Sequence, residues 1–181
     1  MSSPASSAVS IPHLLSRFRR NRRGSVAVEF ALVAPVFFAL LFAILETGIT
    51  FLAGQVLETV TLESARSVLT GQAQNASYTS AQFATYVCSK VPSLFTCNNI
   101  SIDVQNYPSF TSVSISNQID NNSNFISNNL HYNPGGPGDV VVVRLFYQWP
   151  QIVTGLGWNP SNLAGNKRLL VGIAAFKNEP Y

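Results

Sequence analysis

The chain has 181 residues, which is enough for about one domain. Its net charge of +3 is uneven, because five of the eleven basic residues lie near the N-terminus and the other six are outnumbered by eight acidic residues. A nucleic-acid-binding protein needs a basic face on a folded module. The charge distribution therefore argues against a nucleic-acid partner.

An apolar run at residues 26–45 directly follows the basic leader, and Glu29 is its one charged residue. Twenty residues of helix cover about the 30 Å of bilayer hydrocarbon, so the run predicts a transmembrane helix. The first charges after the run are acidic, and the positive-inside rule then places the N-terminus in the cytoplasm. A tail that binds lipid or nucleic acid is the alternative explanation for the arginines, which are Arg17, Arg19, Arg20, Arg22 and Arg23.

Apolar residues continue beyond the run at helical spacing, which predicts one helix over about residues 25–70 that ends at Gly71. Pro35 lies inside this helix and is expected to kink it. Glu46 lies at the outer interface if the span is 26–45. If the span is 30–52, Glu46 is buried and needs a partner.

The remaining chain predicts a small α+β domain. We expect a short linker or turn at 72–77, then a helix over 81–87 that Thr79 or Ser80 caps and Pro92 ends. Alternating residues predict strands at 100–104 and, within a turn-rich region at 106–138, a short strand at 112–115. The continuous apolar run at 139–150 predicts a central strand packed on both faces. A loop at 152–158 and a last strand at 167–176 complete the expectation.

The fold class expected is therefore α+β: a long N-terminal transmembrane helix, then an exported domain with a helix packed on a three- to four-stranded antiparallel sheet. Its parts are a basic cytoplasmic leader at 1–24, a transmembrane helix with an amphipathic extension at 25–71, and a periplasmic domain at 72–181.

Two cysteines, Cys88 and Cys97, lie in the part expected to be exported. No other Cys and no nearby His is available to complete a zinc site. In an oxidising compartment a disulfide is the leading interpretation, and two buried free thiols are the alternative.

The sequence shows no constellation of catalytic residues. His13 lies in the leader, and His131 is expected to be an exposed loop residue. The aspartates form no paired-carboxylate or metal-binding pattern. We therefore expect a non-enzymatic protein without a cofactor or metal.

The junction between leader and helix carries a family signal. Residues 22–30 read RRGSVAVEF, so a Gly after basic residues is followed five positions later by Glu29 and then Phe30. This arrangement resembles the processing site of type IV pilin-like precursors. More narrowly, residues 24–35, GSVAVEFALVAP, resemble the start of TadE-like proteins of the Tad (Flp) tight-adherence pilus system.

The resemblance implies that a prepilin peptidase cuts after Gly24 and leaves Ser25 as the new N-terminus. It also implies that Glu29 meets the freed amine of a neighbouring subunit, which offsets the cost of a carboxylate in an apolar helix. An unpaired, snorkelling Glu29 is the alternative. The implied partners are other pilin or pseudopilin subunits, the prepilin peptidase, the inner membrane and the Tad secretion machinery.

Two functional hypotheses follow. The first is a minor pilin or pseudopilin-like component of a Tad pilus, which acts through helix packing. The second is a stationary inner-membrane anchor that presents a periplasmic domain to secretion partners. An adhesin is a third, and it rests only on Tyr- and Asn-rich loops.

Overall fold

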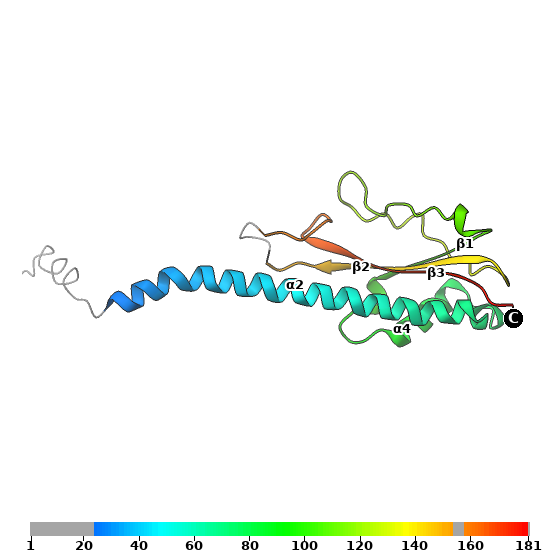
Figure 1. Ribbon diagram of the computed structural model, residues 1–181, viewed down its shortest axis with the longest axis horizontal. Helices are drawn as coiled ribbons and strands as arrows, with labels where there is room; N and C mark the ends of the chain where they lie inside the picture. The colour runs from blue at the N-terminus through cyan, green and yellow to red at the C-terminus, as the bar shows by residue number, and fades with distance from the viewer. Residues whose placement is uncertain (1–23, 154–157, 181) are drawn as a thin grey trace, which may run out of the picture. The chain divides into compact units, whose positions relative to one another are not determined.

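The computed structural model describes residues 24–153 and 158–180. Its helices are α2 (Ser25–Leu69), α3 (Gln72–Asn75) and α4 (Ser80–Lys90), and two 3₁₀ turns lie at Cys97–Asn99 and Phe110–Ser112. The strands are β1 (Ile100–Tyr107), β2 (Val140–Pro150) and β3 (Lys167–Lys177) (Figure 1). These elements confirm the α+β class, with a sheet of three strands.

The chain divides into two compact units between Phe42 and Ala43. The described part of the first unit is the beginning of α2, and the second unit holds the rest of α2 and every other element. The second half of the long helix is thus part of the folded unit.

The buried residues of α2 begin at Thr50 and recur every three or four positions, which places them on one face of the helix. They are Thr50, Ala53, Leu57, Val60, Thr61, Ser64, Ala65, Ser67 and Val68. The helix continues through Pro35 and ends at Leu69, as expected. Gly71 follows in the left-handed region with φ 71°, a conformation that glycine adopts without steric cost.

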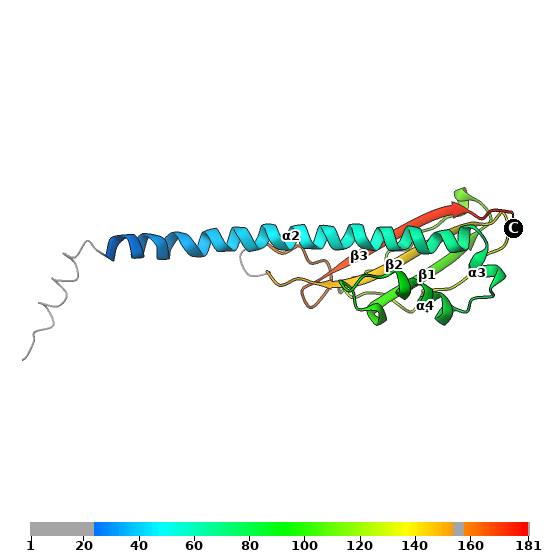
Figure 2. The ribbon, with the colours of Figure 1, turned by 90° about the horizontal axis from the view of Figure 1, so that it is seen from below.

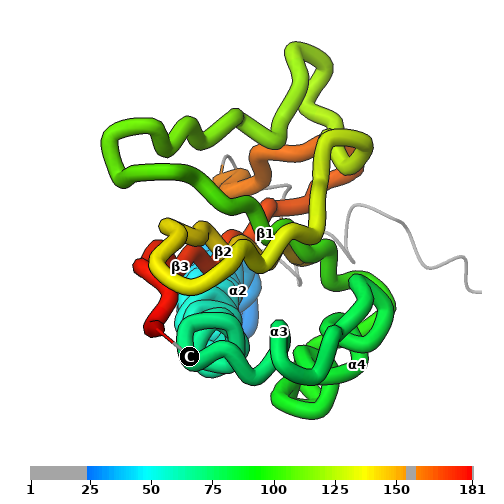
Figure 3. The backbone as a smooth tube through the Cα atoms, turned by 90° about the vertical axis from the view of Figure 1, so that its right-hand side faces the viewer, coloured from blue at the N-terminus to red at the C-terminus, as the bar shows by residue number. Residues whose placement is uncertain are grey.

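The sheet is antiparallel with the order β1-β2-β3, so β2 is central as the sequence predicted. Val104, Val143 and Ala174 lie side by side across the three strands. The face that they share packs against α2 and α4, whereas the other face is covered by the long connection from β1 to β2 (Figure 3). The first eight residues of β2 are buried for this reason.

Helix α4 begins where the sequence placed it. Thr79 is the N-cap, and its side chain and that of Gln82 form a reciprocal capping box. Phe83 and Val87 are the buried residues of α4, and the ring of Phe83 lies 5.2 Å from that of Tyr132 between centroids. Burial, with a smaller contribution from Tyr78, raises the pKa of Tyr132 to about 12.

The strand predicted at 112–115 is wrong. Ser112 ends a 3₁₀ turn, and the next residues have no strand partner. Side chains satisfy this backbone instead: the Tyr107 hydroxyl donates to the Ser114 carbonyl at 3.0 Å, and Arg144 Nη1 donates to the Ser116 carbonyl at 3.2 Å. Alternation of side chains alone does not provide a neighbouring strand.

The residues predicted to be a short linker or turn contain one helical turn, at residues 72–75. Another part of the long connection pairs with β1. The Val104 N–H donates to the His131 carbonyl, and the Asn133 N–H donates to the Val104 carbonyl, both at 2.8 Å. His131 itself is exposed, as expected.

A local turn within the same connection affects the ionisation of Asp120. The pKa of its carboxyl is lowered, and the hydrogen bond from the Asn124 backbone N–H is the main reason.

Gly172 on β3 marks the closest approach of the sheet to α2. A Cβ at this position would lie 2.1 Å from Thr61 Oγ1 and 3.0 Å from the Leu57 carbonyl oxygen. Because that carbonyl belongs to the helix backbone, no rotamer change can remove the second contact. Glycine is therefore required here for the packing of α2 on the sheet.

We predict that Gly172→Ala lowers the free energy of unfolding by about 1–3 kcal/mol, the usual cost of overpacking a core. Denaturant unfolding of the full chain in detergent, followed by tryptophan fluorescence, measures it. Gly48→Ala is the control, because a Cβ there meets nothing within 4 Å. Equal stability of the two variants would contradict the close approach.

Candidate processing and assembly site

The residues of the predicted processing site form the first turns of α2. Gly24 precedes the helix, and Ser25 is its first residue. The Ser25 hydroxyl donates to Glu29 Oε1 at 2.9 Å. Glu29 is exposed, and Phe30 is 67% exposed. The structure thus brings Ser25 and Glu29 together on one side of the helix start.

The arginines expected to set topology, and His13, lie outside the described residues. Their roles stay predictions.

The apolar segment of α2 has no partner within the described chain. In the described residues, α2 is the one helix long and apolar enough to cross a membrane, and none of the residues in its apolar window is buried. Large side chains such as Val26 and Leu32 are more than 70% exposed. Lipid or other helices must cover such a surface.

Glu46 lies just beyond this segment and has partners far along the chain. It is half-buried, and its carboxylate accepts hydrogen bonds from the backbone N–H groups of Ile152 and Val153, the latter at 2.8 Å. One turn later, the buried Thr50 hydroxyl accepts from Gln151 Nε2 at 3.2 Å. These contacts fasten the end of β2 to α2 at the point where the apolar run ends.

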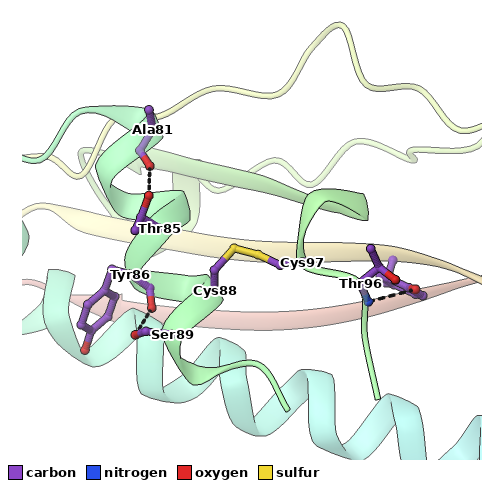
Figure 4. Close-up of a disulfide and its surroundings, with 8 residues drawn as sticks. Ala81, Thr85, Tyr86, Cys88, Ser89, Thr96 and Cys97 are labelled. Atoms are coloured by element: carbon purple, nitrogen blue, oxygen red, sulfur yellow. Dashed lines mark hydrogen bonds between the residues drawn. A yellow bond between two sulfur atoms is a disulfide. The ribbon is translucent and has the colours of Figure 1, made fainter. Parts of the chain in front are cut away.

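Cys88 and Cys97 form a disulfide, with their Cα atoms 5.5 Å apart (Figure 4). The structure therefore favours the disulfide over free thiols. The bridge joins the last turn of α4 to the 3₁₀ turn that precedes β1. Next to Cys97, the Thr96 N–H donates to the Tyr147 hydroxyl at 3.4 Å, so the segment that carries Cys97 is also bound to the central strand.

A buried ion pair lies on the loop-covered face of the sheet. Asp103 and Arg144 are register partners on β1 and β2, and their side chains are 1% and 4% exposed. Arg144 Nε and Nη2 both donate to Asp103 Oδ2, at 2.9 and 2.8 Å. The other oxygen, Oδ1, accepts from the His131 backbone N–H at 2.8 Å.

This pair was missed at the sequence level. The one signal was a single Arg inside a strongly apolar strand, and an inward-facing charge in a central strand implies a partner. The partner lies 41 residues earlier in the chain. The pair acts as a structural link, because it joins two strands to the backbone of the connection that covers them, at Ser116 and at His131.

In residues 24–153 and 158–180, no group of three His, Cys, Asp or Glu side chains could hold a metal ion. The geometry is that of an apolar helix with a polar start, continued into a small α+β unit. This is the construction of a single-span anchored protein.

The comparison with protein families matches one segment of the chain, which lies within the long helix. Residues 24–66 match the family model described as TadE-like protein. The match begins at Gly24 and includes Glu29 and Phe30, so the resemblance seen in the sequence is confirmed over this segment. No curated protein and no solved structure matches the chain.

We predict that Arg144→Met costs about 3–5 kcal/mol of unfolding free energy, because it leaves the Asp103 carboxylate buried without a cation. Replacing both partners, as in Asp103→Leu with Arg144→Met, should restore part of that loss. Lys177→Met, at an exposed position, is the control and should change stability by no more than about 0.5 kcal/mol. If the double variant loses as much unfolding free energy as Asp103→Leu and Arg144→Met lose when added together, the pairing is contradicted.

Removing the disulfide with Cys88→Ser and Cys97→Ser should lower the free energy of unfolding by about 2–3 kcal/mol, as expected for a closed loop of about ten residues. Denaturant melts with and without a reducing agent measure this effect. Reduction should bring the wild type to the level of the variant and leave the variant unchanged. A wild type that is insensitive to reductant would show that the bridge contributes no stability.

Proposed function

We propose that the protein is a minor pilin or pseudopilin-like structural component of the Tad pilus, which acts by packing its helix against other helices in the membrane and in the filament. The observation that carries the proposal is the unpartnered apolar half of α2, which starts with Ser25 and Glu29 in the segment that matches TadE-like proteins. The protein works without catalysis.

The start of α2 is suited to a processing and assembly step. Cleavage after Gly24 by a prepilin peptidase creates a new amine at Ser25, next to the Glu29 carboxylate in the same chain. Ser25 occupies one hydrogen-bonding position of this carboxylate, which has about four. Glu29 thus retains the capacity to accept the amine of a neighbouring subunit, and such a pair offsets the cost of a carboxylate near lipid.

The proposed location is the bacterial inner membrane, with the N-terminus in the cytoplasm and the α+β unit in the periplasm. The arginines before the span support this orientation. The Cys88–Cys97 disulfide supports it independently, because disulfides form and persist in oxidising compartments.

The alternative is a stationary anchor that presents the periplasmic domain to secretion partners. The hydrogen bonds from the Ile152 and Val153 N–H groups to the Glu46 carboxylate favour this alternative, because they fix the folded unit directly at the end of the apolar run. Both functions use the same helix. They differ in whether the protein leaves the membrane.

Recovery of the protein in pili sheared from cells, with its intact mass measured, separates the two. We predict a pilus-associated form that begins at Ser25. Glu29→Gln should reduce its amount in the sheared fraction by about tenfold or more, as expected for the loss of a charge-assisted hydrogen bond. Glu58→Gln is the matched control, since it removes the same charge from an exposed position beyond the apolar run.

Complete retention in the membrane fraction, with the leader still attached, would instead support the stationary anchor. Equal recovery of the Glu29 and Glu58 variants would show that Glu29 has no role in assembly.

A further inference from the structure

The described residues that directly follow β2 lie beside the part of α2 that follows the apolar run (Figure 2). The contacts are specific: Ile152 and Val153 donate to Glu46, and Gln151 donates to Thr50. The folded unit is therefore attached to α2 at both ends of the sheet. At the far end, the Glu179 N–H donates to the Leu69 carbonyl at 3.0 Å.

Large apolar side chains are exposed at the near end. Ile152 is 88% exposed and Trp158 is 50% exposed. On the adjacent turns of α2, Phe51 and Leu52 are 71% and 56% exposed. A groove between the two elements is lined by Thr47, Phe51, Trp158 and Leu170, among others. Exposed residues of this size on two neighbouring elements are unusual for a surface that faces only water.

Of the two spans that the sequence allows, 26–45 places Glu46 at the outer interface, and the level of this surface is derived from that span. The apolar run ends at Leu45, and Glu46 is the first charge after it. Because the Ile152 N–H donates to the Glu46 carboxylate, Ile152 lies at the level where the helix leaves the hydrocarbon. Two backbone N–H groups satisfy that carboxylate, which lowers the cost of placing it close to lipid.

We propose that Ile152 and Trp158 form a second membrane contact, in which both side chains insert into the boundary between headgroups and acyl chains of the leaflet where α2 emerges. Tryptophan is enriched at this depth in membrane proteins. The charged residues of the described connection and the start of β3 are Lys167 and Arg168, both exposed, and they complement anionic headgroups. The contact rests on the membrane anchoring in the proposed function.

The contact has a consequence for assembly. A folded unit anchored only by its helix can turn together with that helix about the helix axis, whereas a unit that also contacts the bilayer at Ile152 and Trp158 keeps one side toward it. Entry into a filament then requires that these side chains leave the lipid together with the helix.

The test uses the full chain in vesicles of phosphatidylcholine and phosphatidylglycerol. Because both native cysteines are in the disulfide, an added cysteine is the sole free thiol. An environment-sensitive fluorophore is attached to Ile152→Cys, to Leu40→Cys within the apolar run, and to Thr111→Cys. Thr111 is an exposed residue beyond the far end of β1.

Lipids that carry a nitroxide at a shallow or a deep position then report depth. We expect the probe at 152 to shift to the blue and to be quenched mainly by the shallow nitroxide. The probe at 40 should be quenched mainly by the deep one, and the probe at 111 by neither. Quenching at 152 no greater than at 111, with normal quenching at 40, would overturn the second contact and leave the anchor intact. Absence of quenching at 40 would overturn both.

The two native tryptophans give a check that needs no added thiol. Brominated lipids should quench the emission of the Trp149→Phe variant, which reports Trp158, more than that of the Trp158→Phe variant, which reports the half-buried Trp149. Aqueous iodide tests whether a second copy of the chain covers this surface instead. If the probe at 152 is shielded from iodide only at a high protein-to-lipid ratio, and lipid nitroxides do not quench it, the surface contacts a second copy and the proposal is overturned.

Discussion

The structure depends on one helix that must serve two environments in succession. Its first half is apolar on all sides, whereas its second half buries one face against the sheet. From Glu46 to Leu69 the helix rises about 35 Å, and the eleven residues of β2 span about the same length. The sheet can therefore be fastened to α2 at both ends, and Gly172 permits close contact between them.

The two faces of the sheet are stabilised in different ways. The helix-covered face is apolar, and its core runs from Ala53 on α2 to Ala174 on β3. The other face is covered by a connection with little regular structure, which buries few apolar side chains. The Asp103–Arg144 pair compensates for the small apolar contact on this face, because it binds the backbone of that connection at Ser116 and at His131. A polar, turn-rich segment can in this way form an ordered layer.

This division has a functional meaning. The folded unit has an apolar core of its own, a disulfide and a buried ion pair. The apolar half of α2, in contrast, finds no partner in the described chain and must be completed by lipid or by other subunits. Such a distribution suits a protein whose working surface is its helix, as proposed for a Tad pilus component. In the proposed second membrane contact, the exposed side chains of Ile152 and Trp158 extend the lipid-facing surface to the edge of the folded unit.

Much of this was determined by the sequence alone, because the relevant signals are local. A run of twenty residues with one charge after five arginines specifies a span, and the spacing from Val56 to Leu69 specifies its amphipathic continuation. Thr79 or Ser80 specifies the start of α4, and the structure selects Thr79. The apolar run in β2 indicated a strand buried on both faces. The family signal is local too, since it lies within the first turns of α2. The short strand expected at 112–115 failed because a strand requires a neighbour, and residue alternation does not show whether one is present.

Only the tertiary structure decided the contacts that join distant parts of the chain. Asp103 and Arg144 are 41 positions apart, and Glu46 and Ile152 are 106 positions apart. No periodicity links such residues, because their proximity arises from strand register and from the packing of the sheet on the helix. The sequence therefore determined that the protein has an anchor and a small α+β unit, and the tertiary structure decided which edge of that unit lies where the anchor ends.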